Sequence, residues 1–520
     1  MSQRDDSTPS SSHAIGDDGA SRTWLVTLAA CTVAVALQCG FAPLADPDLP
    51  NHLSLGEWIL VHRAVPFTEP FAWTRSGAPF YAYSWLAQIA MFALLRATGP
   101  VGLHVLAAVL GAAITVASAM ASRALGSRWS GAVAFAVASA VVAQECTPFL
   151  RPQLVMHALV PLAWLCVARL RQGGSGASLV VLMLLSAVAA NVHITFPVMA
   201  VPLVILFTSD ASATRRRAWM AAAAVAAGWM LSPYATAWLD VFRLNFADNV
   251  ITRPPAANGE LAPGFIVSPL IGAAIAMLPV LAVPALRLER ERLAYGALWL
   301  VGLLVFATIF KGLGPWWWCA TPMVVAALSR IPRASGEPAR RLIAALLFVL
   351  AATLAIPSVR LYHALAALEG DAASRTLPGI KSYATEPAAR WLARHMRRNA
   401  GGRLLTVFNY GSYLKWRLPS LSESIDGRTI FPDSAALPDA VAERGVLDLG
   451  PWRSADVAIV PLSYPVAQLL DMQESWARIG VAAPAPWARS ASPAGLWVRR
   501  EWWARSRADR APGPRDGILR

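Results

Sequence analysis

The segment DPDLPNHLSLGEWILVHRAVPFTEPFAWTRSGAPFYAYSW, residues 46–85, decides how the rest of the chain is interpreted. It follows directly on a long apolar run, so the two carboxylates at its start, Asp46 and Asp48, lie at the end of a predicted membrane span. A charged side chain at the edge of a bilayer is costly unless it is hydrated or paired, and such side chains often serve a function. The segment therefore predicts a functional loop at a membrane surface.

Composition gives the class of protein. Of the 520 residues, 56% are hydrophobic and 15% are charged, and the mean hydropathy is +0.47. These values indicate an α-helical multi-pass membrane protein and argue against a set of soluble domains. The net charge of +14 comes from arginines in short clusters between apolar runs, which is the pattern that orients membrane proteins. No nucleic-acid partner is expected.

The start of the chain and its cysteines agree with this class. Residues 1–22 are polar and are predicted to form a disordered cytoplasmic tail. The apolar run from Trp24 to Leu44 is too long for a signal-peptide core and lacks a cleavage site, so we interpret it as an uncleaved first span. The five cysteines lie inside or at the ends of apolar segments without metal-ligand spacing, and no disulfide framework is expected.

Eleven apolar segments are long enough to cross about 30 Å of hydrocarbon, if some of them are short or tilted. They are residues 24–44, 100–122, 128–145, 152–169, 178–191, 193–208, 217–232, 264–284, 293–310, 315–330 and 340–357. Together they define a transmembrane domain over residues 23–358, whose first loop covers residues 45–99.

Basic residues are distributed unevenly over the connections between these segments. One set of alternate connections, with the N-terminal tail, carries sixteen basic residues, whereas the other set carries seven. The positive-inside rule places the richer set, and the N-terminus, in the cytoplasm. The first loop is then external, and an odd number of spans places everything after Pro357 outside as well.

The external C-terminal region, residues 359–505, is predicted to be a small α/β domain. Its expected strands are Arg403–Phe408, Ser422–Asp426, Asp456–Pro461 and Gly495–Arg499. Its expected helices are Glu386–Arg398, Tyr410–Leu418, Leu437–Arg444 and Pro465–Trp476. Residues 506–520 are polar and are predicted to be an unstructured tail.

Two parts of the first loop have the pattern of amphipathic helices. Asn51–His62 and Ser84–Ala97 each place apolar residues mostly on one side, which predicts helices that lie at the membrane surface. An alternative is that residues 84–98 cross the membrane, which would change the number of spans and the topology.

Asp46 and Asp48 are the main candidates for chemistry. Carboxylates two residues apart suit a general base, or a site for a divalent cation such as Mg²⁺ or Mn²⁺ that handles a charged leaving group. The alternative is a hydrated loop at the end of a helix. Because acids at the edge of a membrane are expensive, we favour the functional interpretation.

Other polar residues are predicted to reach the same external face. His52 either orients a carboxylate or binds a phosphate, or it is a packing residue. Glu69 is either a substrate contact, a weaker candidate than Asp46, or a turn residue that accepts backbone hydrogen bonds. Seven further residues complete the set, and several of them leave alternatives open. Glu145 and Arg151 either pair with each other or Arg151 binds a lipid phosphate; Asn191 and His193 either contact substrate or form a tight turn; Lys311 is a phosphate candidate; and Tyr234 and Glu57 have no assigned role.

The order of these motifs resembles the GT-C class of integral-membrane glycosyltransferases. The residues that carry the resemblance are Asp46-Pro47-Asp48, His52-Leu53, Gly56-Glu57-Trp58-Ile59, Arg151-Pro152-Gln153, Asn191-Val192-His193, Asn409–Leu414 and Ile425–Arg428. One departure is Glu69, where such members often carry Asp.

The resemblance implies a bacterial inner-membrane enzyme that moves a sugar from a polyprenyl-phosphate donor to a lipid, glycan or protein acceptor. It implies that Asp46 or Asp48 acts as base or holds a metal, and that Tyr413, Asp426 and Arg428 of the external domain shape the acceptor entrance. The alternative for Asp426-Gly427-Arg428 is a structural turn. The rival hypothesis is a transporter or a polysaccharide-export component, against which stand the lack of a sequence repeat and the clustering of polar residues at one face.

Overall fold

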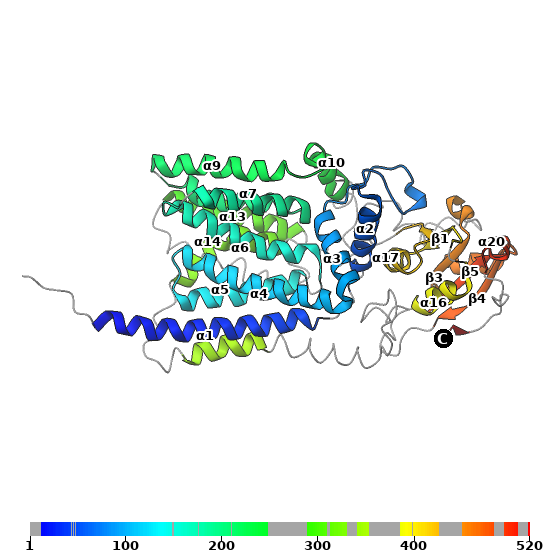
Figure 1. The fold of residues 1–520 in the computed structure, drawn as a ribbon, viewed down its shortest axis with the longest axis horizontal. Coiled ribbons are helices and arrows are strands. Elements are labelled where there is room, and N and C mark those ends of the chain that lie inside the picture. The colour runs from blue at the N-terminus through cyan, green and yellow to red at the C-terminus, as the bar shows by residue number, and fades with distance from the viewer. Residues whose placement is uncertain are drawn as a thin grey trace, which may run out of the picture.

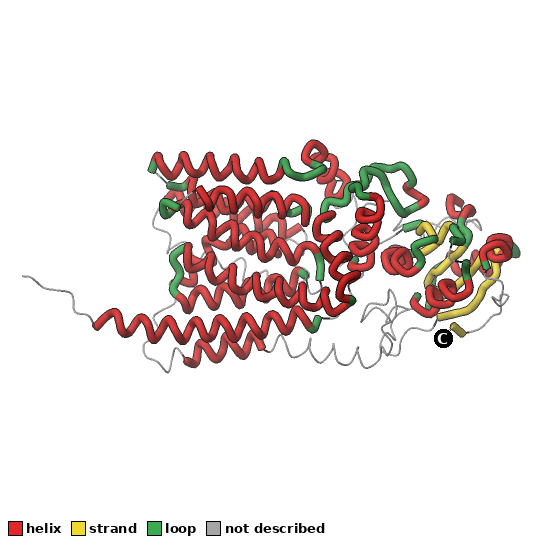
Figure 2. Tube along the Cα trace, in the orientation of Figure 1, coloured by secondary structure: helices red, strands yellow, loops and turns green. Residues whose placement is uncertain are grey.

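The computed structural model describes most of the chain. The described residues are 12–42, 44, 46, 48–147, 150–174, 176–209, 211–247, 289–308, 313–329, 341–352, 385–397, 399–425, 450–482, 493–507 and 518–519. A bundle of long helices forms one part and a small mixed sheet forms the other (Figures 1 and 2).

The bundle consists of helices that run side by side (Figure 1). They are α1 (Ser12–Gly40), α4 (Pro100–Ala124), α5 (Trp129–Cys146), α6 (Pro152–Arg171), α7 (Gly176–Val192), α9 (Ser212–Trp229), α13 (Glu289–Thr308) and α14 (Leu313–Ser329), with a further helix at Arg341–Ala352. Within the described residues, α4, α5, α6 and residues 21–40 of α1 are long and apolar enough to cross a membrane. Apolar side chains such as Val33 of α1 and Val105 of α4 are exposed, as expected for a surface that faces lipid.

The structure confirms a multi-pass membrane fold but differs from the predicted spans in places. Helix α1 begins at Ser12, inside the predicted tail 1–22, since lengthening an existing helix needs no new nucleation. Residues 193–208 do not form one continuous α-helix; they form a 3₁₀-helix, η2 (Phe196–Leu203), followed by α8 (Val204–Phe207). Pro202 inside this segment lacks the N–H that a regular helix requires. Segment 264–284 lies outside the described residues, and the count of eleven spans stays a prediction.

The two ends of the bundle differ in chemistry. At one end, which we call the arginine-rich end, Arg171 pairs with Glu291 at 3.0 Å and Arg217 donates to the carbonyl of Leu170. Residues at three of the basic connections that the sequence assigned to one side therefore meet in space. The opposite end carries the first loop, and we call it the loop end.

Two helices of the first loop, α2 (Leu49–His62) and α3 (Trp85–Thr98), lie across the loop end of the bundle (Figure 1). Helix α3 has 14 residues, or about 21 Å at 1.5 Å per residue, which is shorter than a hydrocarbon core. Gly99 follows with φ +67°, a conformation that favours glycine, and Pro100 then starts α4 in a new direction. The sharp turn at Gly99 separates α3 from α4, and the placement of α3 at the membrane surface stays a prediction.

The chain between α2 and α3 is held in place by a tyrosine from further along the sequence. It contains a short 3₁₀-helix, η1 (Trp73–Arg75). The buried hydroxyl of Tyr234 donates to the carbonyl of Pro66 at 2.9 Å and accepts from the backbone N–H of Ala82 at 3.0 Å. Tyr234 precedes the short helices η3 (Ala235–Ala237), α10 (Trp238–Phe242) and η4 (Arg243–Ala247). One side chain therefore fixes both arms of the loop.

The C-terminal region contains the predicted small sheet, with strand order β2-β1-β3-β5-β4-β6. The strands are β1 (Gly402–Thr406), β2 (Leu421–Glu423), β3 (Val457–Pro461), β4 (Trp476–Ala482), β5 (Ala494–Arg499) and β6 (Ile518–Leu519). Strands β2, β1 and β3 are parallel, whereas β5 is antiparallel to both β3 and β4. The helices are α16 (Glu386–His395), α17 (Phe408–Arg417), η10 (Gly450–Ser454), α19 (Pro465–Met472) and α20 (Arg500–Ser506).

Three elements of this region differ from the sequence prediction. Strand β4 replaces the end of the helix expected to reach Trp476, strand β6 lies in the expected tail, and α20 was not predicted. The expected helix at residues 437–444 lies outside the described residues.

The domain contacts the first loop directly. Helix α17 packs against α2, and Ile425 packs in one cluster with Leu55 and Ile59 of α2. The indole N–H of Trp73 donates to the carbonyl of Leu404, and the hydroxyl of Thr74 donates to the carbonyl of Ser424. The domain therefore covers the loop end of the bundle through α2 and η1.

Candidate active site

The two loop acids meet one arginine at the loop end of the bundle. Arg151 binds Asp46 with two hydrogen bonds, from Nε to Oδ2 at 2.8 Å and from Nη2 to Oδ1 at 2.7 Å. Its remaining nitrogen, Nη1, lies 3.3 Å from Oδ2 of Asp48. A single guanidinium therefore contacts both carboxylates, and this Asp46–Asp48–Arg151 cluster is the candidate site.

Local structure explains why these three residues meet. Asp46 follows the loop end of α1, and Asp48 is the residue before α2, which contains Pro50 in its first turn. Arg151 precedes α6, whose first residue is Pro152. The backbone N–H of Asp48 also donates to Oδ1 of Asp46 at 3.2 Å, which fixes the position of one acid relative to the other.

The two acids differ in exposure. The Asp46 side chain has no exposed surface, whereas 32% of the Asp48 side chain and 11% of the Arg151 side chain are exposed. A bidentate pair in a site shielded from water is strong, because its charge-assisted bonds are not weakened by solvent. Asp46 is therefore a fixed partner of Arg151, and Asp48 is the acid that solvent can reach.

His52, a predicted substrate contact, lies beside this cluster as a neutral side chain. Its Nδ1 is 3.2 Å from Nε2 of Gln88, an amide nitrogen that can only donate a hydrogen bond. Burial, reinforced by the positive charges of Arg151 and Lys415, lowers the pKa of His52 to about 3. At neutral pH the histidine neither carries a charge nor supplies one to a phosphate.

Lys415 was not among the predicted residues. Its ammonium group, 3% exposed, donates to Oδ1 of Asn51 at 2.6 Å, lies 3.6 Å from Oε1 of Glu423, and sits 4.5 Å from the centre of the Phe71 ring. The lysine joins α17 of the domain to the first turn of α2, directly after Asp48. The only signal in the sequence is that Lys415 is one of three lysines in an arginine-rich chain.

Glu69 and Glu145 take no part in the cluster. Oε1 of Glu69 accepts from the backbone N–H groups of Phe71 at 3.0 Å and Ala72 at 3.1 Å, so this acid stabilises a turn, as one of the two interpretations expected. Glu145 is exposed at the end of α5. The pair between Glu145 and Arg151, one of the two alternatives that the sequence left open, is not formed; Arg151 pairs with Asp46 and Asp48 instead.

Asn191 and His193 form the turn that the sequence offered as one alternative. Oδ1 of Asn191 accepts from the indole N–H of Trp85 at 2.7 Å, which attaches α7 to α3. Nδ1 of His193 is 2.8 Å from the hydroxyl of Thr195, and its ring packs edge-on against Tyr83. Both residues connect the loop to the end of α7.

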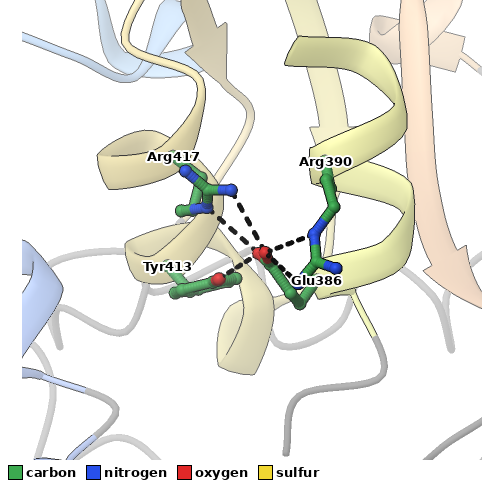
Figure 3. A network of polar contacts seen from close by, with 4 residues as sticks. All are labelled: Glu386, Arg390, Tyr413 and Arg417. Atoms are coloured by element: carbon green, nitrogen blue, oxygen red, sulfur yellow. Dashed lines mark hydrogen bonds and ion pairs between the residues drawn. The ribbon is translucent and has the colours of Figure 1, made fainter. Parts of the chain in front are cut away.

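Tyr413 is buried, so it does not line the predicted acceptor entrance. Its hydroxyl donates to the carboxylate of Glu386, on which Arg390 and Arg417 also converge (Figure 3). Burial alone would raise the pKa of Glu386, but the hydrogen bonds from Arg417 and Tyr413 outweigh it and lower that pKa. This network holds α16 to α17. The predicted contacts Lys311, Asp426 and Arg428 lie outside the described residues.

The geometry does not suit a divalent cation held between Asp46 and Asp48. Both oxygens of Asp46 already accept from Arg151, and a cation would have to share the space with that guanidinium. Over the part of the chain that the structure describes, no three His, Cys, Asp or Glu side chains are grouped as metal ligands.

Comparisons with known proteins show the fold. No family model matches the chain, and none of the curated proteins matches it. A variant of the arabinofuranosyltransferase AftD from mycobacteria is similar in structure, with a TM-score of 0.55 and 18% identity over 91% of this chain. ArnT from Cupriavidus metallidurans, solved with undecaprenyl phosphate bound, has a TM-score of 0.51 and 13% identity over 92% of this chain and 98% of its own.

The chain spans 41% of the length of AftD. The likeness extends over the bundle and the C-terminal region together, and it confirms at the level of the fold the GT-C resemblance that the sequence motifs carried.

Proposed function

We propose that this protein is a membrane glycosyltransferase that moves a sugar from a polyprenyl-phosphate donor to a hydroxyl of a lipid, glycan or protein acceptor. The reaction takes place at the loop end of the bundle, which we assign to the external face of the bacterial inner membrane. Asp48 is the general base, Arg151 binds the donor phosphate, and Asp46 holds Arg151 in place.

One observation carries this proposal: a chain with the fold of the arabinofuranosyltransferase AftD and of ArnT, which was solved with undecaprenyl phosphate bound, places an accessible carboxylate and an anchored, largely shielded guanidinium side by side at one end of the bundle. A base and a phosphate ligand are the two groups that this transfer requires. The transporter hypothesis gains no support, because this cluster lies at the end of the bundle and not within it.

The simplest step is a single displacement. The Asp48 carboxylate takes the proton of the acceptor hydroxyl, and the hydroxyl oxygen forms a bond to the anomeric carbon of the sugar. The bond between that carbon and the phosphate oxygen breaks, and its electron pair stays on the phosphate. The donor phosphodiester, with one negative charge, leaves as a polyprenyl phosphate with two, and Arg151 stabilises the added charge. The sugar arrives with inverted configuration.

Purified protein in liposomes with labelled polyprenyl-phosphate sugars tests this function. We expect wild type to transfer sugar from at least one donor, and Arg151→Lys to transfer more slowly because lysine cannot bind Asp46 in two places. If no donor loses its sugar in the presence of acceptor lipids, glycans and peptides, the proposed function is wrong.

A further inference from the structure

The three nitrogens of the Arg151 guanidinium are held unequally. Nε and Nη2 bind Asp46 at 2.8 and 2.7 Å, in a place with no exposed surface on the acid. Nη1 meets Asp48 at 3.3 Å, and that acid is 32% exposed. One side of the guanidinium is therefore anchored, and the other is held by a longer contact to an acid that solvent can reach.

A second anion that approaches Arg151 from the membrane surface meets the Asp48 side first. Asp46 cannot leave easily, because removing one partner of a buried, bidentate pair leaves the other charge without compensation. The exposed contact to Asp48 is weak by comparison, since solvent screens it. Nη1 is thus the position on this guanidinium where one anion can replace another.

We propose that Arg151 exchanges anions during the reaction: the donor phosphate takes the place of Asp48 at Nη1, while Asp46 keeps the guanidinium in position. This inference rests on the proposed function and adds an order of events to it. Before the donor binds, the Asp48 carboxylate is paired with Arg151. After the exchange, it has lost that cation and faces the acceptor.

The exchange couples base activation to donor binding. A carboxylate beside a guanidinium is stabilised in its charged form and accepts a proton poorly, and it becomes a better base when the cation is taken by phosphate. The acceptor hydroxyl is therefore deprotonated only when the donor is present. Donor binds before acceptor in this scheme.

Binding of undecaprenyl phosphate, without any sugar, tests the exchange directly. If Asp48 competes with phosphate for Nη1, Asp48→Asn should bind this probe more tightly than wild type, by about fivefold, the size of an exposed ion pair. Asp46→Asn should bind it more weakly, by about tenfold or more, because the unanchored guanidinium is no longer positioned. The two substitutions, two residues apart, are thus expected to change the affinity for undecaprenyl phosphate in opposite directions.

Glu57→Gln is the matched control for charge. Glu57 lies on α2, nine residues after Asp48 and about 13 Å further along the helix axis. Glu57→Gln changes the net charge by the same amount as Asp48→Asn. Its affinity for undecaprenyl phosphate should equal that of wild type. Measurements use the full chain in lipid nanodiscs, and thermal unfolding shows whether each variant is folded. If Asp46→Asn does not fold, the comparison of Asp48→Asn with Glu57→Gln decides alone.

The outcomes separate this inference from the proposed function. If wild type binds undecaprenyl phosphate but Asp48→Asn binds it equally or more weakly, the exchange is overturned and the function stands. The exchange is also overturned if Glu57→Gln tightens binding as much as Asp48→Asn, because the effect is then one of general charge. If wild type does not bind the probe, the proposed function falls and the exchange falls with it.

Discussion

Asp46 and Asp48 are two residues apart, yet their surroundings differ. Asp46 is buried against Arg151 through two hydrogen bonds, and Asp48 keeps a third of its side-chain surface exposed. We predict that Asp46→Asn lowers the free energy of unfolding by about 3 kcal/mol, because it leaves the largely buried Arg151 without its main partner. Asp48→Asn should lower it by less than about 1 kcal/mol.

Thermal unfolding in detergent, compared at equal protein concentration, measures both variants. Equal losses of stability for Asp46→Asn and Asp48→Asn would contradict the division into anchor and base, because a shared structural role predicts no difference.

His52 should make stability depend on pH. Unfolded His52 takes up a proton near pH 6.5, whereas burial beside Arg151 and Lys415 lowers the pKa of the folded residue to about 3. The stability contributed by neutral His52 is therefore complete above pH 6.5 and is lost as the pH falls below it. Between pH 7.5 and 5.5 wild type should lose about 1 kcal/mol more than His52→Gln, a variant that does not titrate. Parallel unfolding curves for the two proteins over this range would refute the prediction.

At the residue scale, the sequence singled out Asp46, Asp48 and Arg151 but did not indicate that they pair with one another. Asp46, Asp48 and Arg151 stood out because charges at the ends of apolar runs are unusual. Their pairing spans 105 positions, and the Lys415–Asn51 contact spans 364, so neither follows from a local pattern. Such contacts depend on how the helices pack, which periodicity does not determine.

Helices α2 and α3 approach each other closely at Gly56. A methyl group added there would lie 2.2 Å from the carbonyl oxygen of Gln88 and 2.9 Å from Cβ of Phe92. The first obstacle is backbone, so α3 must shift, and overpacking of this kind costs about 1–3 kcal/mol. We predict that Gly56→Ala lowers both thermal stability and sugar transfer, because α2 carries Asp48 at its start.

Gly296→Ala in α13 is the control for this change. Nothing lies within 4 Å of a methyl group at that position, and alanine favours helix over glycine. Its stability and transfer should equal or exceed those of wild type. A Gly56→Ala protein that is as stable and as active as Gly296→Ala would show that the α2–α3 contact does not position the site.

Elements were predictable where one pattern dominated. Long apolar runs gave α4, α5 and α6 to within a few residues, because burial and lipid exposure both favour apolar residues there. Strand β4 was missed since it follows α19 after a short turn and its Trp476 suits either element. The 3₁₀-helix η2 was missed because hydropathy does not report the hydrogen bonds that Pro202 removes.

On the scale of the whole molecule, the loop end and the arginine-rich end should face opposite sides of the membrane. The five native cysteines are buried, so they contribute little background to thiol labelling. We predict that a membrane-impermeant maleimide added to intact cells labels Glu474→Cys, in the C-terminal domain, and not Gln172→Cys, at the arginine-rich end. Both positions are exposed in the structure. Labelling of Gln172→Cys alone would invert the topology and move the proposed reaction to the cytoplasm.

The sequence predicted the overall architecture of the molecule but not how its two parts contact each other. Hydropathy, the asymmetry of arginine and the order of short motifs together predicted a GT-C-like membrane fold with a small C-terminal sheet, and the fold bears this out. They did not predict that the domain reaches α2 through Lys415 and covers the loop end. That docking joins parts distant in the chain and has no local signal.

The most direct test of the proposed transfer measures both of its products. Wild type, Asp48→Asn and Glu57→Gln are incubated in liposomes with the labelled polyprenyl-phosphate sugar that wild type accepts, and both polyprenyl phosphate released and sugar transferred are measured. We predict one polyprenyl phosphate for each sugar transferred by wild type and Glu57→Gln, and a rate lower by about 10²-fold or more for Asp48→Asn, the usual contribution of a general base. Transfer by Asp48→Asn at the wild-type rate would contradict the account.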